Sequence, residues 1–103
     1  MKSTLKILFA DDDLKYSLVL KRFLEREGYE VTYTGNGTMA LKQFPVVKPD
    51  LVLLDINMPG LNGFEVAEKI REQDRHVLIF FLSDRDRIMN IFAYNTKTKQ
   101  TVK

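Results

Sequence analysis

Two groups of aspartates stand at the ends of apolar runs in this sequence. Asp11, Asp12 and Asp13 directly follow the first run, and Asp55 directly follows another. Carboxylates that are held close together raise one another's pKa unless a cation lies among them. A hard divalent cation such as Mg²⁺ prefers oxygen ligands of this kind. The aspartates therefore predict a Mg²⁺ site if the fold brings the two runs together.

The apolar pattern predicts strands that would carry these aspartates. Short apolar runs alternate with longer amphipathic stretches along the chain. Three of the four short runs are nearly continuous, which is typical of parallel strands buried on both faces. The second run alternates between apolar and polar residues and indicates the edge of a sheet. We expect strands at residues 5–10, 29–34, 51–54 and 77–82.

The amphipathic stretches predict helices between and after the strands. Gly28 favours the end of the first helix, and Pro45 is expected to close the second. Asn62 and Glu65 have the spacing of a capping box at the start of the third. The alternation of strands and helices predicts an α/β fold, a doubly wound parallel sheet with helices on both faces. We expect helices at residues 14–27, 38–44, 63–71 and 88–94.

Doubly wound sheets bind ligands beyond the carboxyl ends of their strands. Asp11, Asp12, Asp55 and Ser83 all follow predicted strands, so neighbouring strands would bring them to one edge of the sheet. Each aspartate also has a structural interpretation, since Asp is common as a helix N-cap and at the start of turns. One helix needs only one cap, so we interpret Asp13 as the cap and the other residues as a site.

Composition limits the classes of function. The 103 residues fit a single domain, and 16 basic against 14 acidic residues give no excess for binding nucleic acid. Because the chain has no cysteine, it forms neither disulfides nor thiolate metal sites. No segment is long and apolar enough to span a bilayer. We therefore expect a cytoplasmic protein.

Two stretches of the sequence resemble the receiver domain of bacterial two-component response regulators. They are residues 6–13 and 49–63, each an apolar strand with its terminal aspartates and the loop that follows. The entry to the second strand at 28–31 and the strand that ends at Ser83 are similar too. The resemblance covers roughly residues 5–84. It implies a flavodoxin-like fold with strand order 2-1-3-4-5, which the apolar pattern alone does not give.

The resemblance also implies a role for each site residue. Asp55 matches the phosphoacceptor, which is also a Mg²⁺ ligand, and Ser83 matches the hydroxyl that switches toward the phosphoryl group. Asp12 matches a direct Mg²⁺ ligand, Asp11 a ligand through water, and Asn57 a ligand through its backbone carbonyl. The implied partner is a sensor histidine kinase that donates the phosphoryl group.

The C-terminal part departs from the family pattern. Receiver domains carry a lysine, usually followed by proline, at the end of strand five, and no Lys-Pro pair follows Ser83 here. Lys103 is the best substitute by position and Lys99 the next. Residues 84–103 are too few for a complete C-terminal part, so strand five is uncertain or missing. Its absence would expose the edge of the 77–82 strand, which predicts a homodimer or strand exchange at that edge.

Three functions remain open from the sequence. The first is a phosphoacceptor module in two-component signalling, not an enzyme beyond its self-catalysed phosphotransfer and dephosphorylation. The second is a Mg²⁺-dependent phosphohydrolase that uses the same carboxylates. It would need a general acid for the leaving group, and no residue stands out for that role. The third is a binding or dimerisation module in which phosphotransfer has been lost.

Overall fold

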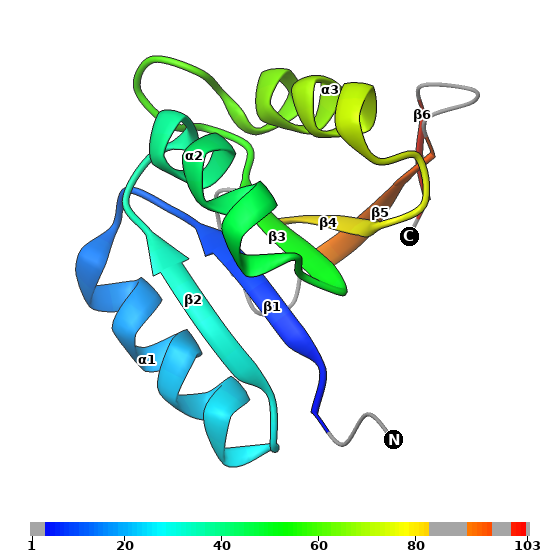
Figure 1. Cartoon of the computed structure of the whole chain (residues 1–103). Coiled ribbons are helices and arrows are strands. Elements are labelled where there is room, and N and C mark those ends of the chain that lie inside the picture. Colours follow the sequence, from blue (N-terminus) through cyan, green and yellow to red (C-terminus); the bar gives the residue numbers. More distant parts are fainter. Residues whose placement is uncertain (1–3, 83–90, 96–99, 103) are drawn as a thin grey trace.

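The computed structural model describes residues 4–82, 91–95 and 100–102. Within these ranges the strands form one sheet, and helices pack on it (Figure 1). The strands are β1 (Lys6–Ala10), β2 (Glu30–Thr34), β3 (Leu51–Asp55), β4 (Leu78–Leu82), β5 (Ile91–Asn95) and β6 (Gln100–Val102). The helices are α1 (Leu14–Arg26), α2 (Gly37–Val47) and α3 (Gly63–Gln73).

The sheet has the order β2-β1-β3-β4-β5-β6. Its first four strands are parallel, and β1 lies between β2 and β3. Ala10 at the end of β1 pairs with Thr34 on one side and with Leu54 on the other. The predicted parallel sheet is therefore confirmed over these strands, in the order that the resemblance implied.

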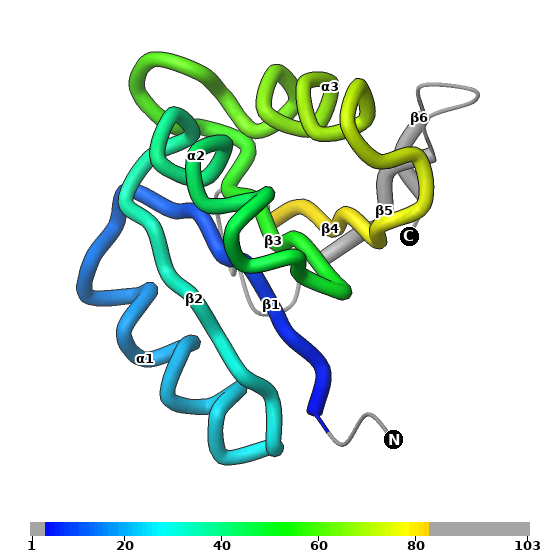
Figure 2. Tube along the Cα trace, viewed as in Figure 1, coloured from blue at the N-terminus to red at the C-terminus, as the bar shows by residue number. Residues whose placement is uncertain are grey.

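The central strands β1 and β3 are buried on both faces, as the continuous apolar runs predicted. Leu8 of β1 belongs to the core under α2 and α3, whereas Phe9 belongs to the core under α1. Successive residues of a strand point to opposite faces, so a strand covered on both faces has no polar alternation. The chain trace shows α2 and α3 side by side, away from α1 (Figure 2).

The helix ends match the sequence signals in all but one place. Gly28 follows α1 with a φ of 99°, a left-handed conformation that glycine adopts without strain. The helix α2, however, does not end at Pro45. Its last residue is Val47, and Lys48 is the C-cap. Lys48 takes the left-handed conformation and donates its N–H to the carbonyl of Phe44. Proline removes one donor, but its fixed φ is compatible with a helix.

The prediction of a helix at residues 88–94 was wrong. Residues 91–95 form the strand β5, which pairs antiparallel with β4, and β6 pairs antiparallel with β5. Only residues 83–90 separate β4 from β5, whereas a parallel crossover needs a dozen residues or more. A fifth strand is therefore present, but it runs opposite to the strand that the resemblance implied.

This arrangement also covers part of the β4 edge. Phe80, Phe81 and Leu82 pair with β5, so the expectation of an exposed edge was wrong for these three residues. Leu78 has no partner in that register, and its side chain is 56% exposed.

Among the residues that the structure describes, no helix combines the length and apolar character needed to cross a membrane.

Candidate functional site

Three carboxylates meet at the carboxyl edge of the parallel strands. Ala10 of β1 pairs with Leu54 of β3. Asp11 follows Ala10 and Asp55 follows Leu54, so both aspartates lie at the same edge of the sheet. Oxygen atoms of Asp11, Asp12 and Asp55 all lie within 4.8 Å of one another. The prediction that the fold brings these aspartates together is confirmed.

The three carboxylates differ in their exposure. Asp11 and Asp55 are fully buried, while Asp12 is exposed to solvent. Burying a carboxylate without a compensating charge costs free energy, and a second one beside it adds repulsion. This cost falls with a bound cation, and oxygen ligands within this distance suit a hard divalent ion. The donor set therefore fits Mg²⁺.

Asp11 is fixed by hydrogen bonds at three points. Its N–H donates to the carbonyl of Thr34 at 3.2 Å, which extends the pairing of β1 with β2 by one residue. Its Oδ1 accepts the N–H of Asp13 at 2.9 Å. Its carbonyl oxygen accepts the hydroxyl of Tyr33 at 2.6 Å. The backbone that enters the site is thus tied to the neighbouring strand.

Asp13 has the structural role that the sequence indicated. Its Oδ1 accepts the N–H of Tyr16 at 3.1 Å, which makes it the N-cap of α1. An N-cap satisfies a backbone donor that has no partner within the helix. The third aspartate of the run is therefore used to start the helix.

The loop after β3 holds Asp55 against the start of α3. Asp55 Oδ1 accepts the N–H of Asn57 at 3.3 Å, and the N–H of Ile56 donates to Leu82 of β4 at 3.2 Å. Gly63 returns to this loop and donates its N–H to Ile56 at 2.9 Å. A side chain on Gly63 would collide with the carbonyl oxygen of Asp55. A glycine is therefore required for this approach of helix to strand.

The start of α3 is fixed by the predicted capping box. Asn62 Oδ1 accepts the N–H of Glu65 at 2.9 Å, and Glu65 Oε1 accepts the N–H of Asn62 at the same distance. These reciprocal bonds satisfy two donors at the helix start. They anchor the far end of the loop that begins at Asp55.

The remaining predicted site residues divide into two groups. Asn57 lies in the loop beside Asp55, with its N–H on that carboxylate. Ser83, Lys99 and Lys103 lie outside the described residues. Leu82, directly before Ser83, pairs with Asp55 across β3 and β4.

Tyr33 is a site residue that the sequence interpretation missed. Burial raises the pKa of its hydroxyl, which the Ser17 hydroxyl opposes, and the charges of Asp11, Asp12 and Asp13 raise the pKa further. The signal that could have identified it is its position, one residue before the carboxyl end of β2.

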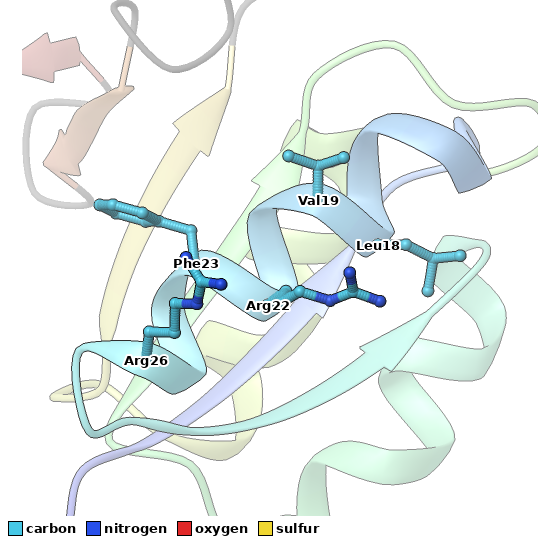
Figure 3. A pocket seen from close by; sticks show the side chains of 5 residues that line it. All are labelled: Leu18, Val19, Arg22, Phe23 and Arg26. Atoms are coloured by element: carbon cyan, nitrogen blue, oxygen red, sulfur yellow. The ribbon is translucent and has the colours of Figure 1, made fainter.

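A second surface feature lies on the outer face of α1. A hollow there is lined by three apolar side chains and two arginines, all on this helix (Figure 3). Exposed apolar side chains gathered on one helix are typical of a protein-binding surface. The residues are Leu18, Val19, Arg22, Phe23 and Arg26.

Comparison with known proteins places the chain in a defined family. A model of the response regulator receiver domain matches residues 7–101. The alkaline phosphatase synthesis transcriptional regulatory protein PhoP of Bacillus subtilis is 40% identical over 81 residues, 79% of this chain and 34% of that protein. The transcriptional regulatory protein TrcR of Mycobacterium tuberculosis is 33% identical over 88 residues, 85% of this chain and 34% of that protein. The chain thus spans about a third of the length of these relatives.

Solved structures agree with the sequence comparison. The response regulator TrrA of Thermotoga maritima, in complex with Mg²⁺-BeF, superposes with a TM-score of 0.75 and 41% identity. The match covers 80% of this chain and 71% of that one. A chain from the complex of the histidine kinase ThkA with TrrA matches at a TM-score of 0.74 and 40% identity, over 84% of this chain and 74% of that chain.

Proposed function

The chain belongs to the response regulator receiver domain family, and we propose that Asp55 accepts a phosphoryl group in a reaction that requires Mg²⁺. The observation that carries this proposal is the meeting of Asp11, Asp12 and Asp55 within 4.8 Å at one edge of the sheet. TrrA, a neighbour by structure, has been solved in complex with Mg²⁺-BeF, which supports the proposal that this chain also binds Mg²⁺.

We assign different roles in Mg²⁺ binding and nucleophilic attack to the carboxylates. We assign Asp12 as the direct Mg²⁺ ligand, since it is the exposed member of the three. Asp11 would act through water, Asn57 would contribute its backbone carbonyl, and Asp55 would also contact the ion. When bound, Mg²⁺ would offset the repulsion between the Asp55 carboxylate and the anionic phosphoryl group. The buried carboxylate of Asp55, held at Oδ1 by Asn57, acts as the nucleophile.

The transfer from a phosphohistidine replaces a phosphorus–nitrogen bond by a phosphorus–oxygen bond. A carboxylate oxygen of Asp55 forms a bond to phosphorus while the bond from phosphorus to the donor's imidazole nitrogen breaks. The products are an aspartyl phosphate and a free histidine. Since Asp55 is fully buried, the atoms that cover it must move aside for the phosphoryl donor. Hydrolysis of the acyl phosphate later restores Asp55.

The product changes the charge at the sheet edge. An acyl phosphate adds nearly two negative charges and three acceptor oxygens beside Asp11 and Asp12. We propose that the hydroxyl of Ser83 donates to one of these oxygens, as the family resemblance implies. Such a rearrangement would bias a surface that has two states.

The partner that donates the phosphoryl group is a sensor histidine kinase. ThkA forms a complex with TrrA, and TrrA is 41% identical to this chain. We propose that the kinase docks on the outer face of α1 (Figure 3), where Leu18, Val19 and Phe23 are 50, 64 and 55% exposed. The arginines beside them favour a partner surface that is apolar with acidic groups at its rim. Because α1 begins directly after Asp13, a partner on its N-terminal half lies beside the carboxylates.

The family and the charge support a proposal for the setting of this reaction. A net charge of +2 gives no basic excess for nucleic acid, so we propose that these residues signal without contacting DNA. We place the reaction in the cytoplasm.

A second function is favoured by the C-terminal strands. The antiparallel hairpin of β5 and β6 stands where the resemblance implied a parallel fifth strand and its lysine. Loss of that lysine would weaken phosphoryl binding and leave a binding module, with a homodimer through the unpaired part of β4 as its simplest form.

One experiment separates these functions. The chain is incubated with acetyl phosphate and Mg²⁺, and its intact mass is measured. We expect one phosphoryl adduct, which EDTA and Asp55→Asn both abolish. Release of phosphate without an adduct would favour a phosphohydrolase, and no reaction at all would favour the binding module.

A further inference from the structure

Tyr33 connects the apolar core under α1 with the acidic edge of the sheet. Its ring packs on Phe9 with 5.6 Å between ring centroids and an angle of 57°. Its hydroxyl extends beyond the end of β1 and donates to the carbonyl oxygen of Asp11 at 2.6 Å. A phenylalanine would fill the same space, so the hydroxyl is the part of this side chain that packing does not require.

The contact fixes one particular peptide group. The carbonyl oxygen of Asp11 and the N–H of Asp12 belong to the same planar peptide unit. The N–H of Asp11 is already held by Thr34. With both bonds in place, residues of β2 hold the N–H and the carbonyl oxygen of Asp11. The peptide plane between Asp11 and Asp12 therefore cannot rotate freely.

Asp12 depends on its backbone for its direction. It is exposed, and no hydrogen bond to its carboxylate is present in the described part of the chain. Asp11 and Asp55, in contrast, each accept a backbone N–H at Oδ1. The peptide plane before Asp12 therefore decides whether its carboxylate remains near the other two.

We propose that Tyr33 is a positioning residue for the cation site, because its hydroxyl holds the Asp11–Asp12 peptide so that the Asp12 carboxylate stays beside Asp11 and Asp55. This role rests on the proposed function, since it concerns the Mg²⁺ that supports phosphorylation of Asp55. Residues that orient metal ligands commonly contribute to affinity without touching the metal.

The test compares Tyr33→Phe with Tyr29→Phe and the wild type. Tyr29 also packs in the core under α1, but it precedes β2 at the opposite end of the sheet. Both variants remove one hydroxyl and keep the ring. Mg²⁺ affinity is measured by calorimetry, and phosphorylation by acetyl phosphate is followed by intact mass over a range of Mg²⁺ concentrations.

We expect Tyr33→Phe to bind Mg²⁺ about tenfold more weakly than the wild type. The Mg²⁺ concentration for half-maximal phosphorylation should rise by a similar factor, while the maximal rate stays within about twofold because Asp55 is unchanged. Tyr29→Phe should match the wild type in both measurements. A general loss of folding would lower the maximal rate as well. Weaker Mg²⁺ binding with an unchanged maximal rate therefore identifies positioning.

Each other outcome is decisive. If Tyr33→Phe binds Mg²⁺ within about twofold of the wild type, the positioning role is wrong. It is also wrong if Tyr29→Phe loses as much affinity as Tyr33→Phe. If the wild type binds Mg²⁺ but forms no adduct, the phosphoacceptor function fails, and weaker binding by Tyr33→Phe still supports positioning. If the wild type binds no Mg²⁺, both proposals are overturned.

Discussion

Asp11 and Asp55 lie at the same edge of the sheet, each fully buried, one residue beyond the pairing of Ala10 with Leu54. Their neighbourhood is a consequence of strand order, since β1 and β3 are adjacent and parallel. Two buried carboxylates so arranged repel each other in the absence of a cation. The fold therefore accepts a local cost at this edge, which is a common property of functional sites.

Mg²⁺ should stabilise the folded protein through these carboxylates. A ligand that binds only the folded state adds about 2.7 kcal/mol to the free energy of unfolding at 100 times its Kd. Urea unfolding with Mg²⁺ and with EDTA measures this gain. We expect Asp12→Asn to abolish it, because the direct ligand is lost.

Asp13→Ala is the matched control for that prediction. It removes the N-cap of α1 and should lower the free energy of unfolding by about 1 kcal/mol, yet it should keep the gain from Mg²⁺. An equal gain in Asp12→Asn and in the wild type would contradict the assignment of Asp12 as a ligand.

Gly63→Ala should disturb the loop that carries Asp55. The added Cβ would collide with the Asp55 carbonyl oxygen, and overpacking of this kind costs about 1–3 kcal/mol. Urea unfolding measures the cost, and intact mass after acetyl phosphate treatment should show slower phosphorylation. At Gly35 a Cβ would lie 3.8 Å from the Tyr33 hydroxyl, an ordinary contact. Equal stability of Gly63→Ala and Gly35→Ala would show that the close approach is unimportant.

The stability of the metal-free protein should fall in alkali because of Tyr33. Burial raises the pKa of its hydroxyl above the usual 10.0 in the folded state, with a further increase from the charges of Asp11, Asp12 and Asp13. The unfolded chain then releases this proton at lower pH than the folded one. The stabilisation is therefore complete below pH 10 and is lost as the pH rises through the folded pKa.

Unfolding in EDTA between pH 9 and pH 12 tests that dependence. The wild type and Tyr29→Phe should lose stability with pH more steeply than Tyr33→Phe, which lacks the titrating group. Identical slopes in the wild type and Tyr33→Phe would show that the pKa of Tyr33 is not raised.

The outer face of α1 should matter for a kinase and not for a small donor. Phe23→Ala removes an exposed aromatic side chain, and we expect kcat/KM for transfer from the phosphorylated kinase to fall about tenfold, since aromatic residues dominate binding at such surfaces. The rate with acetyl phosphate should not change. The kinase is found by screening purified phosphorylated histidine kinases for transfer to the wild type.

Val46→Ala provides the control for this surface. Val46 is 74% exposed on α2, so its removal changes apolar exposure away from α1. Docking elsewhere would be indicated if both variants accept phosphoryl groups from the kinase at the wild-type rate.

The parallel part of the fold was readable from the sequence for a physical reason. Strands buried on both faces have nearly continuous apolar runs, as at residues 51–54, and here these runs alternate with longer amphipathic stretches. Their terminal aspartates then mark the edge of the sheet. The cap at Asp13 and the capping box at Asn62 were predictable because they depend only on neighbouring residues.

The parts that were not predicted depend on longer-range geometry. Residues 88–94 form a short apolar run, and periodicity at that length does not distinguish a helix from a strand. The direction of β5 follows from the short connection at 83–90 and from pairing with β4. The role of Tyr33 was not predicted, since only the three-dimensional structure shows its hydroxyl at Asp11.

The position of the phosphoryl group tests whether Asp55 is the phosphoacceptor. After reaction with acetyl phosphate and Mg²⁺, borohydride reduces an aspartyl phosphate to homoserine, and peptide mass spectrometry then locates the changed residue. We predict homoserine at Asp55 in the wild type and none after treatment in EDTA. Homoserine at Asp11, Asp12 or Asp13, or an unreduced adduct at another residue, would contradict the assignment of Asp55 as the phosphoacceptor.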